Sequence, residues 1–182
     1  MNTQPDHRHS IRLQGYDYGT EGAYFITIVT QVRECLLGKI ESGEIQLNDA
    51  GQMIEKWWLE LGHKFPKINT ETFIVMPNHI HGIIVINPGD DVGSTPCVRP
   101  AGVHTSSPLS EMVQWFKTMT TNAYIREVKQ NQWPPFPGKL WQRNYYEHII
   151  RDETEWKQIY AYIENNPMQW EMDNENPTKG SS

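Results

Sequence analysis

The chain has 182 residues, of which 37% are hydrophobic and 21% are charged, and these values predict one folded domain with its own hydrophobic core. The aromatic content excludes a disordered chain. No apolar run can span a bilayer and no signal peptide is visible, so we expect a cytoplasmic protein without membrane contacts. The net charge of −6 excludes indiscriminate coating of DNA, but segment 111–151 is locally basic and is compatible with an anion-binding groove.

Residues 1–22 form the first predicted region, a polar arm without a core pattern. Basic and aromatic side chains recur in this arm, namely Arg8, Arg12, Tyr16 and Tyr18. Because such side chains contact phosphates and stack on bases, we expect these four residues to bind DNA. The alternative is a disordered tail followed by a pair of tyrosines at a strand edge.

The first half of the domain shows strand patterns on both sides of one helix pattern. Alternating polarity with β-branched and aromatic residues predicts strands, and apolar residues at helical spacing after a capping residue predict the helix. In chain order we expect a strand at 22–31, a hairpin at 35–47 that turns at Ser42-Gly43, a helix from Asn48 or Asp49 to about Leu61, and two strands within 70–87.

The second half begins with a segment rich in Gly, Pro, Ser and Thr, which predicts a flexible insertion at 88–108. Two amphipathic helices with a strand between them follow. In chain order we expect a helix at 109–128, a rigid connector at 133–138, a strand at 139–151, a helix from Asp152 or Thr154 that Pro167 limits, and a disordered tail at 171–182.

Without the hairpin and the last helix, this order is β-α-β-β-α-β, the split pattern of ferredoxin-like folds. The sequence therefore predicts an α+β, ferredoxin-like or RRM-like domain over residues 23–170. We expect an antiparallel sheet with two helices on one face and an added C-terminal helix.

Two histidines, His79 and His81, flank one hydrophobic residue at the start of a predicted central strand. Side chains at positions i and i+2 of a strand share a face, so both imidazoles can converge on one metal ion. A half-exposed structural pair is the alternative, because a His-x-His pattern by itself is weak evidence for a metal site.

The last predicted helix carries a second candidate pair, Tyr162 and Asn166. Residues four apart stack on one helix face, so a phenol nucleophile and an amide ligand can lie side by side there. The alternative makes Tyr162 a packing residue and Asn166 a C-cap before Pro167. A competing pair, Tyr160 and Glu164, lies on a different side of the same helix.

Several sequence blocks together resemble a known family. The block MPNHIHGIIVI is similar to the HUH strand (His, hydrophobic, His) of single-strand DNA transposases that use one catalytic tyrosine. The combination with SIRLQGYDY, GAYFITIVTQVRECLLG, WQRNYYEHIIR and YIENNP, in that order, resembles the REP-associated tyrosine transposases. The resemblance extends from about Ser10 to Asn166, apart from the insertion.

The resemblance implies roles for particular residues. His79 and His81 match the metal-binding histidines and Tyr162 matches the nucleophile. Asn166 stands where the wider family has a polar third ligand, often Gln. Because Asn is one methylene shorter than Gln, direct ligation by Asn166 is less secure than ligation by the two histidines. The implied cofactor is Mg²⁺ or Mn²⁺, and two imidazoles with one amide would bind Mg²⁺ weakly. Arg143, in the WQRNYYEHIIR block, joins the DNA-binding candidates.

The implied function is a metal-dependent endonuclease and strand transferase that forms a 5′-phosphotyrosine on single-stranded, hairpin or repetitive palindromic DNA. We expect a monomer or a homodimer. Two alternatives remain at this point. The first is a domesticated, non-catalytic binder of repeat DNA. The second is a zinc hydrolase that uses His148 with His79 and His81.

Overall fold

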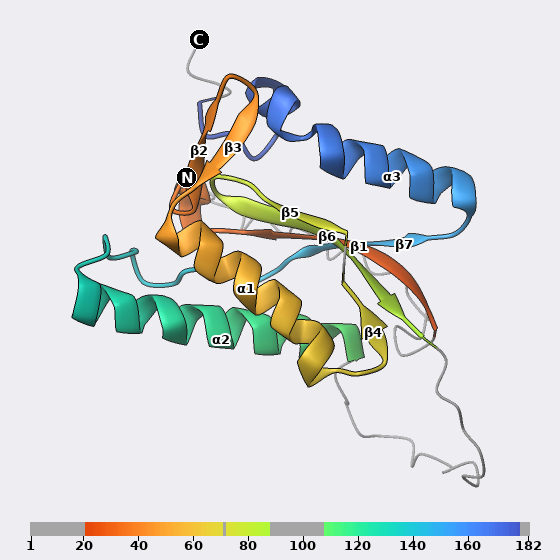
Figure 1. Cartoon of the computed structure of the whole chain (residues 1–182), viewed down its shortest axis with the longest axis horizontal. Helices are drawn as coiled ribbons and strands as arrows, with labels where there is room; N and C mark the ends of the chain where they lie inside the picture. Colours follow the sequence, from red (N-terminus) through yellow and green to blue (C-terminus); the bar gives the residue numbers. More distant parts are fainter. Residues whose placement is uncertain (1–20, 71, 88–107, 179–182) are drawn as a thin grey trace, which may run out of the picture.

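An antiparallel sheet lies at the centre of the computed structural model, which describes residues 21–70, 72–87 and 108–178. Its strands are ordered β4-β6-β1-β7, and β5 also pairs with β6 (Figure 1). This is the strand order of a ferredoxin-like sheet, which confirms the predicted fold class. The strands are β1 Gly22–Val29, β4 Ile68–Asn69, β5 Phe73–Val75, β6 His79–Ile86 and β7 Tyr146–Ile150.

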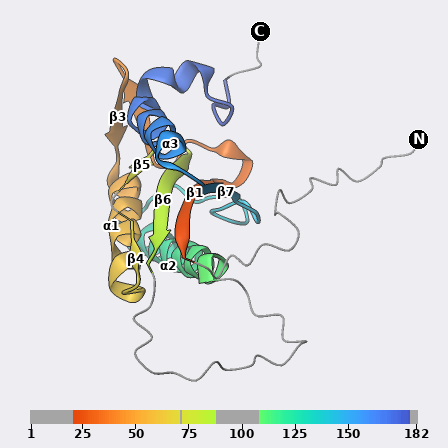
Figure 2. The ribbon, with the colours of Figure 1, turned by 90° about the vertical axis from the view of Figure 1, so that its right-hand side faces the viewer.

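Helices cover both faces of this sheet: the two predicted on one face lie there, and the added C-terminal helix covers the other (Figures 1 and 2). Helices α1 (Asp49–Lys64) and α2 (Pro108–Asn131) lie side by side on one face, and α3 (Glu153–Asn165) lies on the other (Figures 1 and 2). None of the described helices combines the length and the apolar character that a membrane span requires.

Most of the buried apolar side chains of the sheet face α1 and α2. Tyr24, Ile26 and Ile28 alternate along β1 and join the large core cluster, to which Trp58 of α1 and Phe116 of α2 also belong. The Trp58 and Phe116 rings meet edge to face with centroids 5.6 Å apart. This face therefore closes as a conventional hydrophobic core.

Gly82 of β6 is part of the same packing. A Cβ atom at this position would lie 2.3 Å from Cζ2 of Trp58, so a side chain there would displace the indole. Since Gly82 separates His81 from Ile83, the absence of a side chain toward the α1 face lets Trp58 fill that space while His81 points to the opposite face.

Local sequence signals explain the element boundaries. The hairpin consists of β2 (Gly38–Glu41) and β3 (Glu44–Leu47), and both of its turn residues have positive φ, 53° at Ser42 and 79° at Gly43. The Asn48 side chain accepts a hydrogen bond from Gly51 N at the start of α1, and Asp152 accepts one from Glu155 N at the start of α3.

Two expectations need correction. The predicted strand at 139–151 is shorter, because Trp141 forms only an isolated bridge to Thr30 and regular pairing starts at Tyr146. Residues 171–178 do not form the expected disordered tail. A 3₁₀ helix, η2 (Pro167–Met172), leads into turns that return over the sheet. The arm at 1–20, the insertion segment 88–107 and the end 179–182 lie outside the described residues.

Candidate functional site

The two histidines of β6 lie together on the sheet face that α3 covers. His79 pairs in register with Val29 and His81 with Thr27, and the two Nε2 atoms are 3.0 Å apart. Their side chains are buried, with 0% and 3% of their surface exposed. The prediction that both rings share one face of a central strand is therefore correct.

Hydrogen bonds to the other ring nitrogens indicate the tautomers. Asn78 donates from Nδ2 to the carbonyl oxygens of Arg33 (2.9 Å) and Glu175 (2.7 Å), so its Oδ1 is the atom 2.8 Å from Nδ1 of His79. Nδ1 of His79 must then donate, which leaves a lone pair on Nε2. Nδ1 of His81 lies 2.8 Å from Oγ1 of Thr27, and in the tautomer in which Nδ1 donates to this hydroxyl the second Nε2 lone pair points at the first. Two converging lone pairs are what a cation would need.

Burial keeps both imidazoles neutral at pH 7. It lowers the pKa of His79 to about 3. The pKa of His81 lies well below its ordinary value, mainly because of burial and then because of His79, and the attraction of Asp173 opposes this only in part. Neutral imidazole is the form that binds metal ions, so no proton competes for these nitrogens near neutral pH.

Asp173 is the third potential ligand, and the sequence analysis missed it. The ligand atoms of His79, His81 and Asp173 all lie within 4.8 Å of one another, and Oδ2 of Asp173 is 3.8 Å from Nε2 of His79. With His79 neutral this contact is not an ion pair. Oδ2 is buried and has no hydrogen-bond partner among the described residues. An orphaned carboxylate oxygen beside two imidazole lone pairs fits a divalent cation.

The segment after α3 brings this carboxylate to the histidines. Trp170 of η2 stacks over His79 with ring centroids 6.0 Å apart. Glu175 anchors the following turns, because its carbonyl oxygen accepts from Asn78 and its carboxylate pairs with Arg33 at 2.7 Å. Asp173 lies in an acidic stretch without apolar periodicity, so the pattern that predicts helices and strands gave no signal for it.

Tyr162 of α3 meets the histidine pair within one chain. Its hydroxyl oxygen is 3.2 Å from Nε2 of His81, and its ring packs edge-on against Phe25 with centroids 6.0 Å apart. The side chain is 40% exposed. Burial of its inner part and then the charge of Asp173 raise the pKa of Tyr162, whereas a hydrogen bond with Asn166 opposes the shift. The phenol is therefore protonated at pH 7, and its hydroxyl can donate to a ring nitrogen.

Asn166 lies at the C-terminal end of α3 and is 1% exposed. Its side chain contacts Tyr162, as the spacing of four residues predicts, and its Oδ1 is buried without a hydrogen-bond partner in the described part of the chain. Asn166 thus offers a second orphaned oxygen next to the tyrosine.

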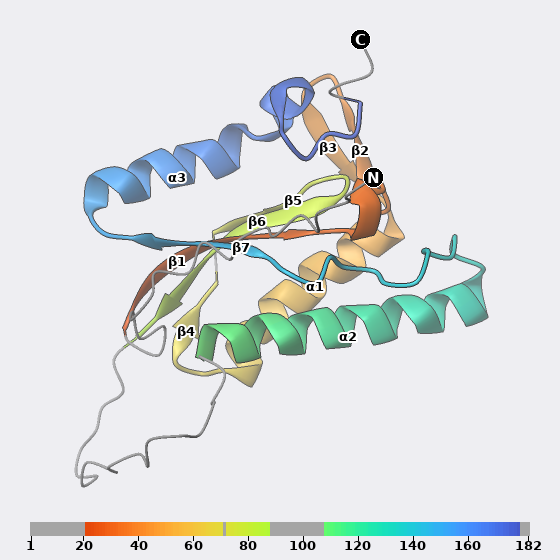
Figure 3. The same ribbon diagram turned by 180° about the vertical axis from the view of Figure 1, so that it is seen from behind.

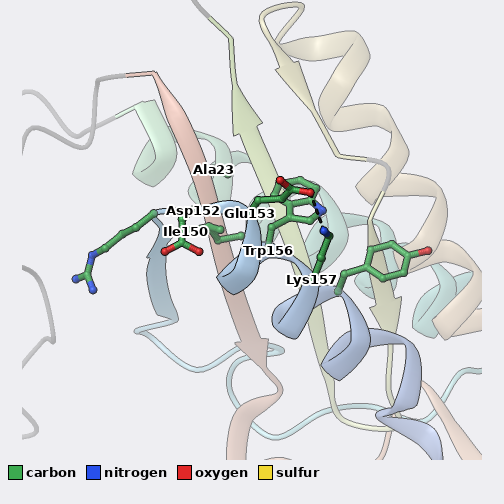
Figure 4. A pocket seen from close by; sticks show the side chains of 8 residues that line it. Ala23, Ile150, Asp152, Glu153, Trp156 and Lys157 are labelled. Carbon is green, nitrogen blue, oxygen red and sulfur yellow. Dashed lines mark ion pairs between the residues drawn. The ribbon is translucent and has the colours of Figure 1, made fainter.

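Tyr160 takes a different direction from α3. It lines a pocket between the end of β7 and the first turns of α3, together with Ile150 and Trp156 (Figure 4). The two tyrosines are two residues apart and lie on different sides of the helix. Tyr162, and not Tyr160, is the one whose hydroxyl contacts His81.

His148 is held away from the pair. Its Nε2 lies 2.6 Å from Oε1 of Glu155, and Oε2 of Glu155 accepts from the backbone N–H of Arg151 at 2.7 Å. That backbone hydrogen bond and the one to His148 lower the pKa of Glu155. His148 is therefore engaged elsewhere, and the zinc-hydrolase alternative lacks its third histidine.

The predicted DNA contacts are only partly within the described chain. Arg8, Arg12, Tyr16 and Tyr18 lie outside the described residues. Figure 3 shows the loop that joins α2 to β7. Arg143 belongs to this loop and is exposed.

Known proteins resemble this chain in sequence and in fold. No protein-family model matches the chain. An uncharacterized protein of Haemophilus influenzae is 40% identical over 172 residues, which cover 92% of each chain, so the two proteins belong to one family. A second protein of that organism, named "Putative REP-associated tyrosine transposase", is 24% identical over 155 residues, 84% of this chain and 73% of its own.

Among solved structures, that of a REP-associated tyrosine transposase bound to a REP hairpin superposes with a TM-score of 0.57 at 20% identity. The superposition covers 87% of this chain and 74% of the other. At this identity, the likeness establishes a shared fold.

Proposed function

The domain has the fold of the REP-associated tyrosine transposases, and from this premise we propose that the chain cuts and rejoins single-stranded DNA through Tyr162, with a divalent cation at His79 and His81. The observation that supports this most directly is the 3.2 Å distance between the Tyr162 hydroxyl and Nε2 of His81. This contact supports Tyr162 as the nucleophile, because its phenol lies beside the histidines that are the proposed metal ligands.

The residues that would hold the cation are His79, His81 and Asp173, with Oδ1 of Asn166 as a further candidate. When bound, a divalent cation neutralises charge on the scissile phosphate and lowers the pKa of a neighbouring phenol. Two imidazoles with one carboxylate suit Mn²⁺ better than Mg²⁺, which prefers an all-oxygen set. We therefore expect Mn²⁺ to be the more effective of the two ions.

In the proposed reaction, Oη of Tyr162 attacks phosphorus and forms a 5′-phosphotyrosine. The bond from phosphorus to the 3′ oxygen breaks, and that oxygen leaves as a hydroxyl after taking a proton from water. Tyr162 is 40% exposed, so water can accept the phenol proton. A later 3′-OH can attack the same phosphorus and release Tyr162, which reseals a strand without ATP.

The proposed substrate is a hairpin with single-stranded flanks, in keeping with the REP hairpin bound by the structural neighbour. Arg143 and the arm residues Arg8, Arg12, Tyr16 and Tyr18 remain the proposed DNA contacts. Because Tyr162 and His81 meet within one chain, the proposed site needs no second protomer.

The test is a covalent adduct between the protein and a hairpin oligonucleotide in the presence of Mn²⁺. We expect Tyr162→Phe to abolish the adduct and Tyr160→Phe, the matched control on the same helix, to retain it. Mass spectrometry of the trapped peptide identifies the residue. An adduct on Tyr160, Tyr145 or Tyr146 would overturn the assignment, and DNA binding without any adduct would favour the non-catalytic alternative.

A further inference from the structure

Two adjacent tyrosines at the start of β7 point to opposite sides of the sheet. Tyr145 is partly buried against the large core cluster, and its hydroxyl lies 3.3 Å from Oγ of Ser110 in α2. Tyr146 faces the side that carries the histidines and is 44% exposed. Tyr145 thus anchors the start of the strand to the core on the α2 side of the sheet. Tyr146 points away from that core and does not contribute to it.

The strand register places Tyr146 in one row with the candidate site. Thr27 of β1 pairs with Tyr146 on one side and with His81 on the other, so the three residues lie across neighbouring strands on the same face. Two strand spacings of about 4.8 Å separate the backbones of Tyr146 and His81 by about 10 Å. A nucleotide next to a phosphate held at His81 can span that separation.

Aromatic contacts connect the same residues. The Phe25 ring stacks on His81 with centroids 5.4 Å apart and meets the rings of Tyr162 and Tyr146 edge-on, at 6.0 Å and 6.1 Å. Tyr146 and Tyr162 are therefore two half-exposed phenol rings packed on one buried phenylalanine.

The loop that leads to Tyr146 is fixed by hydrogen bonds to α2 and to β1. Lys117 of α2 donates to the carbonyl oxygens of Gln142 (3.0 Å) and Asn144 (3.1 Å), and its ammonium lies 5.5 Å from the centre of the Tyr145 ring. Backbone N–H of Gln142 donates to Val29 O at 2.9 Å. An aromatic ring on so constrained a backbone loses little conformational freedom when a flat ligand stacks on it.

We propose that Tyr146 is a base-stacking residue, on which the unpaired base next to the phosphate at the His79–His81–Tyr162 site rests. The inference depends on the proposed function and adds to it a position for one nucleotide of the substrate. Every base has a π-face, so the contact orders the strand without reading its sequence. Exposed Arg143, three residues earlier in the same constrained loop, supplies a positive charge for the adjoining phosphates.

The test measures binding separately from cleavage. The probe is a hairpin oligonucleotide whose single-stranded flank carries one 2-aminopurine, moved base by base in a series, with EDTA present to prevent cleavage. Stacking on Tyr146 quenches 2-aminopurine fluorescence at one position of the series. We expect Tyr146→Ala to remove that quenching and to weaken binding about tenfold, whereas Tyr146→Phe keeps the ring and both signals.

The matched control is Tyr160→Ala, which removes a tyrosine of equal exposure, 44%, from the pocket beside the first turns of α3 and should bind as the wild type does. Equal binding and quenching by Tyr146→Ala would overturn the inference while leaving the Tyr162 adduct to support the proposed function. Position-specific quenching that depends on Tyr146, without any adduct in Mn²⁺, would support the stacking residue and overturn the proposed reaction. Thermal melting of each variant separates lost contact from lost fold.

Discussion

The two faces of the main sheet bury different chemistry. On the face toward α1 and α2, a large cluster of apolar side chains closes around Trp58 and Phe116. On the face toward α3, the apolar cluster is small, built on Phe25, Ile83 and Ile163, and the neighbouring buried side chains include His79 and His81.

Because of this difference, the face toward α1 and α2 mainly stabilises the fold, and the face toward α3 holds the candidate site. Burial of apolar surface stabilises the fold in proportion to area, and the α1 face carries most of it. A buried imidazole or carboxylate costs free energy unless it is hydrogen-bonded, neutral or ligated. The α3 face meets this requirement through Asn78 and Thr27, and it leaves Oδ2 of Asp173 without a partner among the described residues. The α3 face thus buries a group of side chains that could hold a metal ion, beside its small apolar cluster.

The largest expected effect is on the α3 face. We expect His81→Ala and His79→Ala each to abolish Mn²⁺ binding and the covalent DNA adduct, because each removes one of two converging lone pairs. Calorimetric titration with Mn²⁺ and the adduct assay check this. His63→Ala, on the exposed surface of α1, is the control and should retain both activities. Adduct formation by either variant at the wild-type rate would contradict a metal site on this strand.

The next effect tests the opposite face. We expect Trp58→Ala to lower the free energy of unfolding by about 3–5 kcal/mol, because it leaves a cavity among Phe73, Phe116 and Gly82. It also leaves the carbonyl oxygen of Thr70 without the indole N–H that now donates to it at 2.8 Å. Urea unfolding measures the change, and Trp57→Ala, at a partly buried position, should cost less. A folded Trp58→Ala protein that no longer binds Mn²⁺ would show that the two faces are not separable.

Acid should destabilise the protein through the α3 face. His79 has a pKa of about 3 in the folded chain against an ordinary value of 6.5. As the pH falls, this residue is therefore protonated in the unfolded chain before it is protonated in the folded chain. The stability that is linked to neutral, buried His79 is fully present above pH 6.5 and is lost as the pH falls toward 3. In EDTA, we expect the free energy of unfolding to drop by about 3 kcal/mol between pH 7 and pH 4.

The control for this prediction is His79→Asn, whose side chain does not titrate. Its unfolding free energy should depend less steeply on pH in the same interval. Parallel pH profiles for the variant and the wild type would mean that other groups cause the acid sensitivity.

The smallest predicted effect tests whether Asp173 contributes to metal binding on the α3 face. We expect Asp173→Asn to weaken Mn²⁺ binding by about tenfold or more, because it removes the charge that completes the ligand group. Glu171→Gln changes an exposed neighbour of the same charge and should leave the affinity unchanged. Equal affinities for Asp173→Asn and the wild type would remove Asp173 from the ligand set and leave Oδ1 of Asn166 as the remaining orphaned oxygen near the tyrosine.

Periodicity predicted most of the architecture. The alternation along β1, the hairpin turn at Ser42-Gly43 and the caps Asn48 and Asp152 all depend on interactions within a few residues, which the sequence displays directly. The strand before α3 was predicted too long. The residues from Lys139 to Tyr145 are fixed by distant partners such as Lys117 rather than by a ladder of strand pairing.

For the candidate site, the sequence by itself determined that His79 and His81 share one face and that Tyr162 and Asn166 share one side of a helix, since both follow from backbone periods. Only the tertiary structure decided which tyrosine meets the histidines, that His148 pairs with Glu155, and that the Asp173 carboxylate lies beside the two histidines. These three outcomes depend on how α3 and the turns after it pack across the sheet. The contacts of Tyr162 and Asp173 with the histidines join residues 81 and 94 positions apart, and no local pattern encodes them. The His148–Glu155 pair spans only seven residues, but it depends on how α3 turns back from the end of β7.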